Sequence, residues 1–242
     1  MDRQAWLAER RRAVVAAYDA EAPDYDKSEY PSDLQQEWVA RALRLIPPGG
    51  IVLDAPCGTG KYFPLVAAAG HQVVGVDQSA GMLAQARARG VAVELEQVAL
   101  QNLSYAGGFD AVITVDAMEN IPPDDWPLVL ANLHRAVRQG GLMYMTVEEV
   151  EQAKIDEAFR NLCALGLPAV RGEIVEGDVL NGPSPHLTPE RVPSWVPQTG
   201  DCSLRGQHVA AGRAPGSGIR DEPGRRSRHS SGRHHPLGPG TA

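Results

Sequence analysis

Between residues 51 and 148, short apolar runs alternate with longer segments in which apolar residues recur at helical spacing. The runs predict strands at 51–54, 73–77, 91–98, 110–115 and 142–148, and the longer segments predict helices at 60–69, 79–89 and 124–138. The run Ala111-Val112-Ile113-Thr114-Val115 is apolar at almost every position, which is typical of a strand buried on both faces. We therefore expect an α/β fold with a doubly wound, mostly parallel sheet.

Further helices are predicted on both sides of this core, at 3–18, 32–45 and 150–165, followed by a strand or hairpin within 166–178. Their apolar positions are Trp6, Leu7, Val14 and Tyr18, then Leu34, Trp38, Leu43 and Leu45, then Ile155, Ala158, Phe159 and Leu162. We expect one domain over residues 1–195. Within it, residues 51–148 form the ligand-binding core, flanked by residues 1–46 and 149–195.

Several candidate ligand-binding residues follow the predicted strands. Asp54 and Asp77 end the first two strands, while Leu100 and Asp116 lie just beyond the third and fourth. Ligands of doubly wound sheets bind at the carboxyl ends of the strands. Residues that are far apart in sequence should therefore gather at one rim.

The turn after the first strand has the sequence Asp54-Ala-Pro-Cys-Gly-Thr-Gly60. Its glycines let the backbone approach a ligand closely, and the helix start behind it offers free N–H groups to an anion. A dinucleotide fingerprint needs G-x-G-x-x-G, but Gly58-Thr59-Gly60 is followed by Lys61, Tyr62 and Phe63. The missing third glycine and the acid before the turn disfavour a dinucleotide.

The order of five motifs over residues 18–147 resembles the class I S-adenosylmethionine-dependent methyltransferase superfamily. Asp54 to Gly60 is similar to its first motif, D/E-x-G-x-G-x-G, with Pro56 in place of the first glycine. The other motifs are the lead-in Y-x-x-x-A-x-x-Y-D at 18–26, the strand ending in Asp77 with the D-x-S-x-x-M-L-like segment at 77–83, the Phe-Asp strand at 109–116, and the helix end at 133–141 that resembles R-x-L-K-P-G-G.

This resemblance implies a Rossmann-like methyltransferase fold with S-adenosyl-L-methionine as cofactor. It also implies that the flanking residues 1–46 and 149–195 fold over the substrate. Asp77 would accept hydrogen bonds from the ribose hydroxyls, and Leu100 and Gln101 would lie near adenine, at a position that is often acidic in the family. Tyr18 and Tyr25 either close over the cofactor or are core aromatic residues. The implied cofactor-binding residues are Tyr25, Asp54, Ala55, Cys57, Gly58, Gly60, Asp77, Gln78, Met82, Leu100, Gln101 and Asp116.

Methyl transfer from a sulfonium depends mainly on alignment of donor and acceptor, and a general base is needed only if the acceptor must lose a proton. The sequence therefore identifies no catalytic residue. Asp116 and Glu119 are candidates for a base on the acceptor side, although capping of the following helix is the simpler role. The scattered histidines fit no metal-ligand spacing, so no metal is expected.

Charge, cysteine content and the lengths of apolar runs limit the possible partners and location of the protein. The formal net charge is −7, with 30 acidic residues against 23 Lys and Arg, which disfavours nucleic acid as a partner. The three cysteines form no paired spacing, which fits a reducing compartment, and the N-terminus lacks the apolar segment of a secretory signal. No apolar run approaches the ~20 residues that span a bilayer. We expect a cytoplasmic enzyme with a small-molecule substrate; the sequence does not indicate its oligomeric state.

The pattern ends near Trp195. Residues 196–242 contain no Phe, Trp, Tyr or Lys but nine Gly, seven Arg and five Pro, a composition that predicts disorder. The family would place its last helix and final β-hairpin here, so we expect the sheet to lack a normal hairpin. Either the tail is natural, or the reading frame is altered near residues 192–200, which the composition favours.

Three functions follow. The favoured one is methyl transfer from S-adenosyl-L-methionine to an unidentified small molecule at O, N or C. The second is an NAD(P)-binding oxidoreductase. The third is a non-catalytic methyltransferase-like domain, disabled by the loss of its C-terminal strands.

Overall fold

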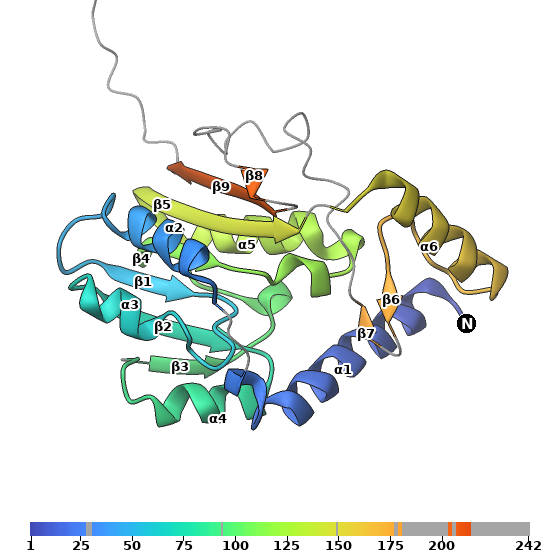
Figure 1. The fold of residues 1–242 in the computed structure, drawn as a ribbon, viewed down its shortest axis with the longest axis horizontal. Helices are drawn as coiled ribbons and strands as arrows, with labels where there is room; N and C mark the ends of the chain where they lie inside the picture. The colour runs from blue at the N-terminus through green and yellow to red at the C-terminus, as the bar shows by residue number, and fades with distance from the viewer. Residues whose placement is uncertain are drawn as a thin grey trace, which may run out of the picture.

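The computed structural model describes residues 1–27, 31–92, 94–148, 150–176, 179–180, 203–204 and 207–213. A central sheet carries helices on both faces (Figure 1). Its strands are β1 (Ile51–Asp54), β2 (Gln72–Asp77), β3 (Glu94–Gln97), β4 (Phe109–Thr114), β5 (Val137–Glu148), β8 (Ser203–Leu204) and β9 (Gln207–Arg213). Their order is β3-β2-β1-β4-β5-β9-β8, and β1 to β5 are parallel. The predicted α/β fold with a doubly wound, mostly parallel sheet is confirmed.

The helices are α1 (Arg3–Glu21), α2 (Asp33–Leu43), α3 (Phe63–Ala68), α4 (Ala80–Ala88), α5 (Trp126–Ala136) and α6 (Gln152–Ala164). Short 3-10 turns are η1 (Tyr25–Lys27), η2 (Leu100–Asn102), η3 (Met118–Asn120) and η4 (Pro123–Asp125), and a separate hairpin joins β6 (Val175–Glu176) to β7 (Val179–Leu180). Helices α2, α3 and α4 pack on one face of the sheet and α5 on the other.

Each central strand contributes side chains to the hydrophobic layers on both faces of the sheet. In β1, Val52 packs toward α2 and α3, whereas the next residue, Leu53, packs toward α5. In β4, Ala111 and Ile113 join the first layer and Val112 the second. The alternation of side chains along a strand explains why the buried strands are apolar at nearly every position.

Helix α2 differs from its sequence prediction. Leu34 and Leu45, two of the apolar positions that predict it, are 43% and 56% exposed. The helix ends at Leu43, so Leu45 lies beyond it, and the buried stripe consists of Gln35, Val39, Ala42 and Leu43. A leucine pattern cannot locate this stripe, because its first member is the polar Gln35.

The C-terminal expectation is wrong in part. Residues 207–213 form β9, which pairs antiparallel with β5, and residues 203–204 pair with β9 as β8. The composition argument concerned the burial of side chains, but an edge strand recruits a partner through backbone N–H and C=O groups, which any residue except proline supplies. The rest of the predicted tail and its altered reading frame lie outside the described residues.

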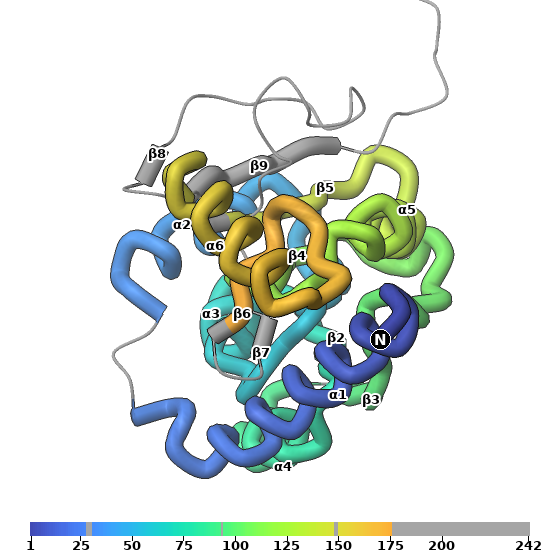
Figure 2. Tube along the Cα trace, turned by 90° about the vertical axis from the view of Figure 1, so that its right-hand side faces the viewer, coloured from blue at the N-terminus to red at the C-terminus, as the bar shows by residue number. Residues whose placement is uncertain are grey.

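Helix α1 lies in front of the carboxyl ends of the strands, together with α6 (Figure 2). It starts at an N-cap, Asp2, whose carboxylate accepts a hydrogen bond from the Ala5 N–H at 2.8 Å. Trp6, Leu7 and Val14 are buried and pack with Leu167 and Val175. Within the described residues, no helix is both long and apolar enough to cross a bilayer.

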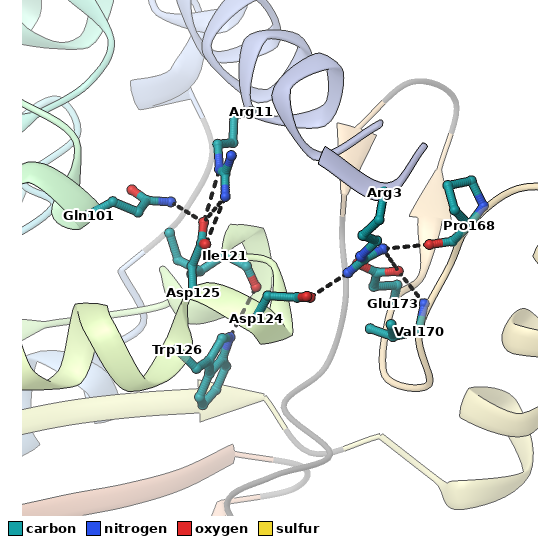
Figure 3. A network of polar contacts seen from close by, with 10 residues as sticks. All are labelled: Arg3, Arg11, Gln101, Ile121, Asp124, Asp125, Trp126, Pro168, Val170 and Glu173. Carbon is teal, nitrogen blue, oxygen red and sulfur yellow. Dashed lines mark hydrogen bonds and ion pairs between the residues drawn. The ribbon is translucent and has the colours of Figure 1, made fainter. Parts of the chain in front are cut away.

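Charged contacts fix α1 at the same rim (Figure 3). Arg3 binds the fully buried Glu173 through two bonds, from Nη1 to Oε2 at 2.9 Å and from Nη2 to Oε1 at 2.6 Å. Its Nη2 also contacts Asp124 at 2.5 Å. About two turns further along α1, Arg11 forms a bidentate pair with Asp125. Its Nε lies 2.9 Å from Oδ2 and its Nη2 lies 2.7 Å from Oδ1. The cover helix is thereby connected to the segment after α6 and to the loop after β4.

Arg3→Met should destabilise the fold. Methionine keeps much of the aliphatic packing but leaves the Glu173 carboxylate buried without its cation, a loss of about 3 kcal/mol or more. Urea unfolding of both proteins measures the difference. The matched control is Arg12→Met, which removes an exposed cation from the same helix and should change stability by less than about 0.5 kcal/mol. Equal losses in both variants would contradict the special role of the Arg3–Glu173 pair.

Candidate functional site

A pocket opens at the carboxyl ends of β1, β2 and β4, beneath the end of α1. It collects residues from the glycine turn, the ends of β2 and β3, the segment after β4, and the two cover tyrosines. The lining residues are Tyr18, Tyr25, Pro56, Cys57, Gly58, Thr59, Lys61, Tyr62, Asp77, Gln78, Met82, Val98, Leu100, Gln101, Val115, Asp116, Ala117, Asn120 and Ile121.

The glycine turn is held against the end of β2. The N–H of Cys57 donates to the Val76 carbonyl at 2.8 Å, and the N–H of Gly58 donates to Asp77 Oδ2 at 2.8 Å. Gly58 has a φ of +53°, a conformation that residues with a Cβ rarely adopt. A Cβ there would meet no atom within 4 Å, so the open space above Gly58 belongs to the pocket.

Behind the turn, the ring of Phe63 fills the space that two glycines leave. A Cβ on Gly60 or on Gly75 of β2 would lie 2.6 Å from this ring. Phe63 is fully buried, which makes it the wedge between the turn and the sheet. Gly60 therefore shapes the turn from below and does not line the pocket.

Asp77 is the carboxylate at the β2 side of the pocket. Its Oδ1 accepts from the Ser79 N–H at 2.9 Å, and its Oδ2 accepts from Gly58. Burial raises the pKa of Asp77 above its ordinary value, and the backbone N–H groups of Ser79, Gly58 and Gln78 partly oppose this rise. Beside it, Met82, Val98 and Leu100 form an apolar slot whose polar edges are Gln78 and Gln101.

Asp116 is the carboxylate at the β4 side. It follows the end of β4 with a φ of +46°, in the left-handed region. Its Oδ1 accepts from the hydroxyl of Thr146 at 2.8 Å, and its Oδ2 accepts from Gln35 Nε2 at 2.7 Å. The Asp116 N–H in turn donates to Thr146 Oγ1 at 2.9 Å.

Tyr18 and Tyr25 close the pocket from the cover. Their rings meet edge to face, with 6.1 Å between centroids, and Tyr18 Oη accepts a hydrogen bond from Asn120 Nδ2 at 2.9 Å. Lys61 Nζ lies 4.5 Å from the Tyr25 ring centre. Burial raises the pKa of Tyr25, and the carboxylates of Asp116 and Glu119 raise it further. Both phenols are therefore neutral near pH 7.

The strap η1 is anchored to the glycine turn. Asp26 Oδ1 accepts a hydrogen bond from Thr59 Oγ1 at 2.6 Å, while Asp26 Oδ2 pairs with Arg89 beyond the end of α4. Arg89 Nε also donates to the Thr59 carbonyl at 2.5 Å. These contacts hold Tyr25 over the pocket.

Most of the sequence-predicted residues come together here. Those that line the pocket are Tyr25, Cys57, Gly58, Asp77, Gln78, Met82, Leu100, Gln101 and Asp116, and the cover tyrosine Tyr18 joins them. Those that do not are Asp54, Ala55, Gly60 and Glu119. Asp54 and Ala55 are instead buried beneath the turn, at 1% and 0% exposure.

Other lining residues escaped the sequence reasoning. Four of them lie within or directly after the glycine turn: Pro56, Thr59, Lys61 and Tyr62. Their position next to the turn is enough to predict that they line the pocket. Ala117, Asn120 and Ile121 lie in the loop after β4, where only Asp116 and Glu119 were singled out. Among the described residues, no group of three His, Cys, Asp or Glu side chains is placed to hold a metal ion.

Geometrically, the pocket joins an apolar slot with a carboxylate at the end of β2 to a second compartment with a carboxylate after β4. It can take a ligand with a planar apolar part and a vicinal diol. A second molecule can then meet that ligand near Asp116. Cys57 contributes no thiolate, because burial raises the pKa of its thiol.

Comparisons with known proteins find a methyltransferase domain model and related methyltransferases. The sequence model for the family described as a methyltransferase domain matches residues 52–141. A malonyl-[acyl-carrier protein] O-methyltransferase from Pectobacterium atrosepticum is 30% identical over 158 residues, covering 63% of this chain and 60% of that protein. The human methyltransferase-like protein 27 is 36% identical over 140 residues, covering 53% of this chain and 55% of that protein. The chain thus spans at most about three fifths of these relatives.

Among solved structures, the DhpI–SAM–HEP complex superposes with a TM-score of 0.52 at 22% identity, covering 69% of this chain and 75% of that one. At this identity the likeness shows the fold alone. Together with the matching family model and the related methyltransferases, it supports the class I S-adenosylmethionine-dependent methyltransferase superfamily and S-adenosyl-L-methionine as the cofactor.

Proposed function

We propose that the chain transfers a methyl group from S-adenosyl-L-methionine to a small-molecule acceptor. The observation that carries this proposal is the Asp77 carboxylate, fixed by the Gly58 and Ser79 N–H groups beside an apolar slot. A carboxylate offers about four acceptor positions, so the backbone N–H groups around Asp77 leave acceptor capacity for a ribose hydroxyl. The slot of Met82, Val98 and Leu100 would then hold adenine.

The remaining parts of the pocket fit the rest of the cofactor. The space above Gly58 would admit the methionine part against the backbone of the turn, since no Cβ occupies it. Cys57 would be a small neutral neighbour, and Tyr18 and Tyr25 would close over the bound molecule. Gln78 and Gln101 would supply hydrogen bonds at the adenine edge, where related proteins often have an acid.

The chemistry then requires mainly proximity. The sulfonium is already activated, so holding acceptor and methyl in line is worth up to about 7–11 kcal/mol of the barrier. The pocket extends past the end of β4 to Asp116 and Asn120, which leaves space for an acceptor next to the sulfonium. The acceptor itself is unassigned, and the relative from P. atrosepticum is named for an acceptor carried on a protein.

Two alternative functions can be distinguished from methyl transfer by experiment. A nicotinamide dinucleotide would need the glycine that Phe63 replaces. A domain without catalysis was suggested by an incomplete sheet, but β9 covers the edge of β5. We also propose the cytoplasm as the location, because Cys57 and Cys163 form no disulfide.

We assign Asp54 an electrostatic role below the cofactor. It is almost completely buried, and its Oδ2 accepts no hydrogen bond within the described part of the chain. Burial raises its pKa well above the ordinary range, and the nearby Asp77 carboxylate adds to this rise. A bound sulfonium and its ammonium group would offset this negative charge. The protein without ligand is destabilised by the same charge.

Asp77→Asn should weaken binding of S-adenosyl-L-methionine tenfold or more, because it removes the charge from the hydrogen bonds to the ribose. Isothermal titration calorimetry with S-adenosyl-L-methionine, S-adenosylhomocysteine and NAD gives the affinities. The matched control is Asp110→Asn, since Asp110 is equally buried, at 7%, but binds the Ile51 N–H at the opposite end of the sheet. Heat from NAD alone would refute the proposed function, and unchanged affinity in Asp77→Asn would remove Asp77 from the site.

Asp54→Asn should stabilise the ligand-free protein increasingly as pH rises. The folded-state pKa of Asp54 is raised above its unfolded value of about 3.9, so the native state prefers the protonated form. Wild type therefore loses stability relative to the variant from about pH 4 up to the raised pKa, above which the difference is constant. Urea unfolding between pH 4 and pH 8 measures this difference. The exposed Asp24→Asn serves as control, and a difference that shrinks with rising pH would contradict the assignment.

A further inference from the structure

The segment after β4 holds one side chain in an unusual state. Asp116 is the only described residue other than glycine with a positive φ, and it lines the pocket. Left-handed backbone at a residue with a Cβ persists only where surrounding contacts impose it, and such residues cluster at functional sites. Here the contacts come from two distant elements, α2 and β5, through Gln35 and Thr146.

Gln35 is itself fixed. It is the third residue of α2 in a capping box, in which its Oε1 accepts from the Ser32 N–H at 2.9 Å and the Gln35 N–H donates to Ser32 Oγ at 3.3 Å. Because Oε1 is used by the cap, Nε2 is the end that faces Asp116, at 2.7 Å from Oδ2. The side chain is 5% exposed, so its donor is available to Asp116 without competition from bulk water.

Asp116 lies at the opposite end of the pocket from the ribose carboxylate. The strand order places β1 and its glycine turn between β2, which ends in Asp77, and β4, which precedes Asp116. A cofactor whose ribose binds Asp77 and whose middle crosses the turn therefore directs its sulfonium toward Asp116. Around Asp116 the wall is largely apolar, formed by Val115, Ala117 and Ile121.

The charge of this compartment is negative. Lys61 is the only cationic side chain among the described pocket-lining residues. Its ammonium lies over the Tyr25 ring and donates to the Tyr25 carbonyl at 3.3 Å, with Asp26 at 4.0 Å. An acceptor that carries its own carboxylate would therefore face Asp116 without a matching cation. An amine or hydroxyl would offer Asp116 a donor.

We propose that Asp116, oriented by Gln35 and Thr146, binds the N–H or O–H group that accepts the methyl, so the substrate class is an amine or a hydroxyl compound and not a carboxylate. This inference rests on the proposed function. Gln35 is a positioning residue in it, because it acts through Asp116 and does not line the pocket.

Methyl transfer forms one bond to the methyl carbon and breaks another. The lone pair of the acceptor nitrogen or oxygen attacks the methyl carbon, a new bond to carbon forms, and the carbon–sulfur bond breaks with its electron pair remaining on sulfur. Positive charge then develops on the acceptor atom, which makes its proton acidic. That proton passes to the Asp116 carboxylate and from there to water.

Sinefungin tests this geometry without a known acceptor. It carries a protonated amine at the place of the sulfonium methyl, whereas S-adenosylhomocysteine has a neutral thioether and no group there. A charged amine beside Asp116 should make sinefungin bind at least about tenfold more tightly than S-adenosylhomocysteine. Asp116→Asn should lower this preference about tenfold or more. Gln35→Met should lower it in the same direction, while both variants keep the affinity for S-adenosylhomocysteine within about threefold.

Two matched controls test whether the effect requires a carboxylate in the pocket and the amide of Gln35. Glu119→Gln removes a carboxylate from the same loop that does not line the pocket, and Gln36→Met alters the exposed neighbour of Gln35. Both should leave the preference for sinefungin unchanged. A wild type that binds neither analogue refutes the proposed function and this inference with it. Binding of both analogues without a preference, or an equal loss in Glu119→Gln, refutes this inference alone.

The product gives a second test. Wild-type protein is incubated with a metabolite extract and a donor labelled in the methyl group. Label attached to nitrogen or to an ether oxygen resists mild alkali, whereas a methyl ester releases labelled methanol. Stable label that mass spectrometry locates on nitrogen or on an ether oxygen supports the amine or hydroxyl class. Label released as methanol, or stable label on carbon or sulfur, overturns it.

Discussion

The pocket depends on one hydrogen bond, from the Gly58 N–H to the carboxylate of Asp77 at 2.8 Å. It joins the turn after β1 to the end of β2, and it forms only because Gly58 adopts a φ of +53°. The same turn is supported from below by Phe63, whose ring occupies the space where Gly60 and Gly75 have no Cβ. The spacing of three glycines and one aromatic ring thus sets the position of the carboxylate. A Cβ at Gly60 or Gly75 would collide with the Phe63 ring, and a Cβ at Gly58 would strain the backbone, so a larger residue at any of the three would disturb the turn and the proposed ribose site.

This arrangement has an electrostatic cost, which other parts of the fold must offset. Asp54 and Asp77 are buried close together, and burial raises the pKa of both. A positively charged cofactor would offset the repulsion between these two carboxylates when it binds. Part of the binding energy would therefore arise at the glycine turn. Stability comes from elsewhere, from the two hydrophobic layers around the sheet and from the buried Glu173 with its bidentate Arg3. The polar site and the elements that stabilise the domain are therefore largely separate.

Local patterns predicted the parts of this molecule that depend on local sequence. Strand ends located Asp77, Leu100 and Asp116 at one rim, because parallel strands bring their carboxyl ends together. Gln35 could not be found in this way: it reaches Asp116 from 81 positions away, and its helix pattern marks leucines as the core residues. Asp54 and Gly60 were placed in the pocket because their motif was treated as a unit, whereas alternate residues of a tight turn point to opposite sides. The β9 strand was missed because its pairing rests on backbone groups, to which composition is insensitive.

The two parts of the cover, α1 and η1, are attached to the domain by different kinds of contact. The first half of α1 is fixed by apolar packing of Trp6, Leu7 and Val14 and by Arg3 and Arg11. The strap η1, by contrast, is held over the pocket by the side chain of Asp26 on Thr59 and on a partly exposed Arg89. Exposed ion pairs contribute little to stability, at most about 1 kcal/mol, whereas apolar packing must be broken over a whole face. The polar side-chain contacts of η1 are therefore weaker than the apolar packing of α1. Tyr25 belongs to η1, whereas Asp116 follows β4 and Gln35 lies on α2, so the two sides of the pocket are attached to different elements.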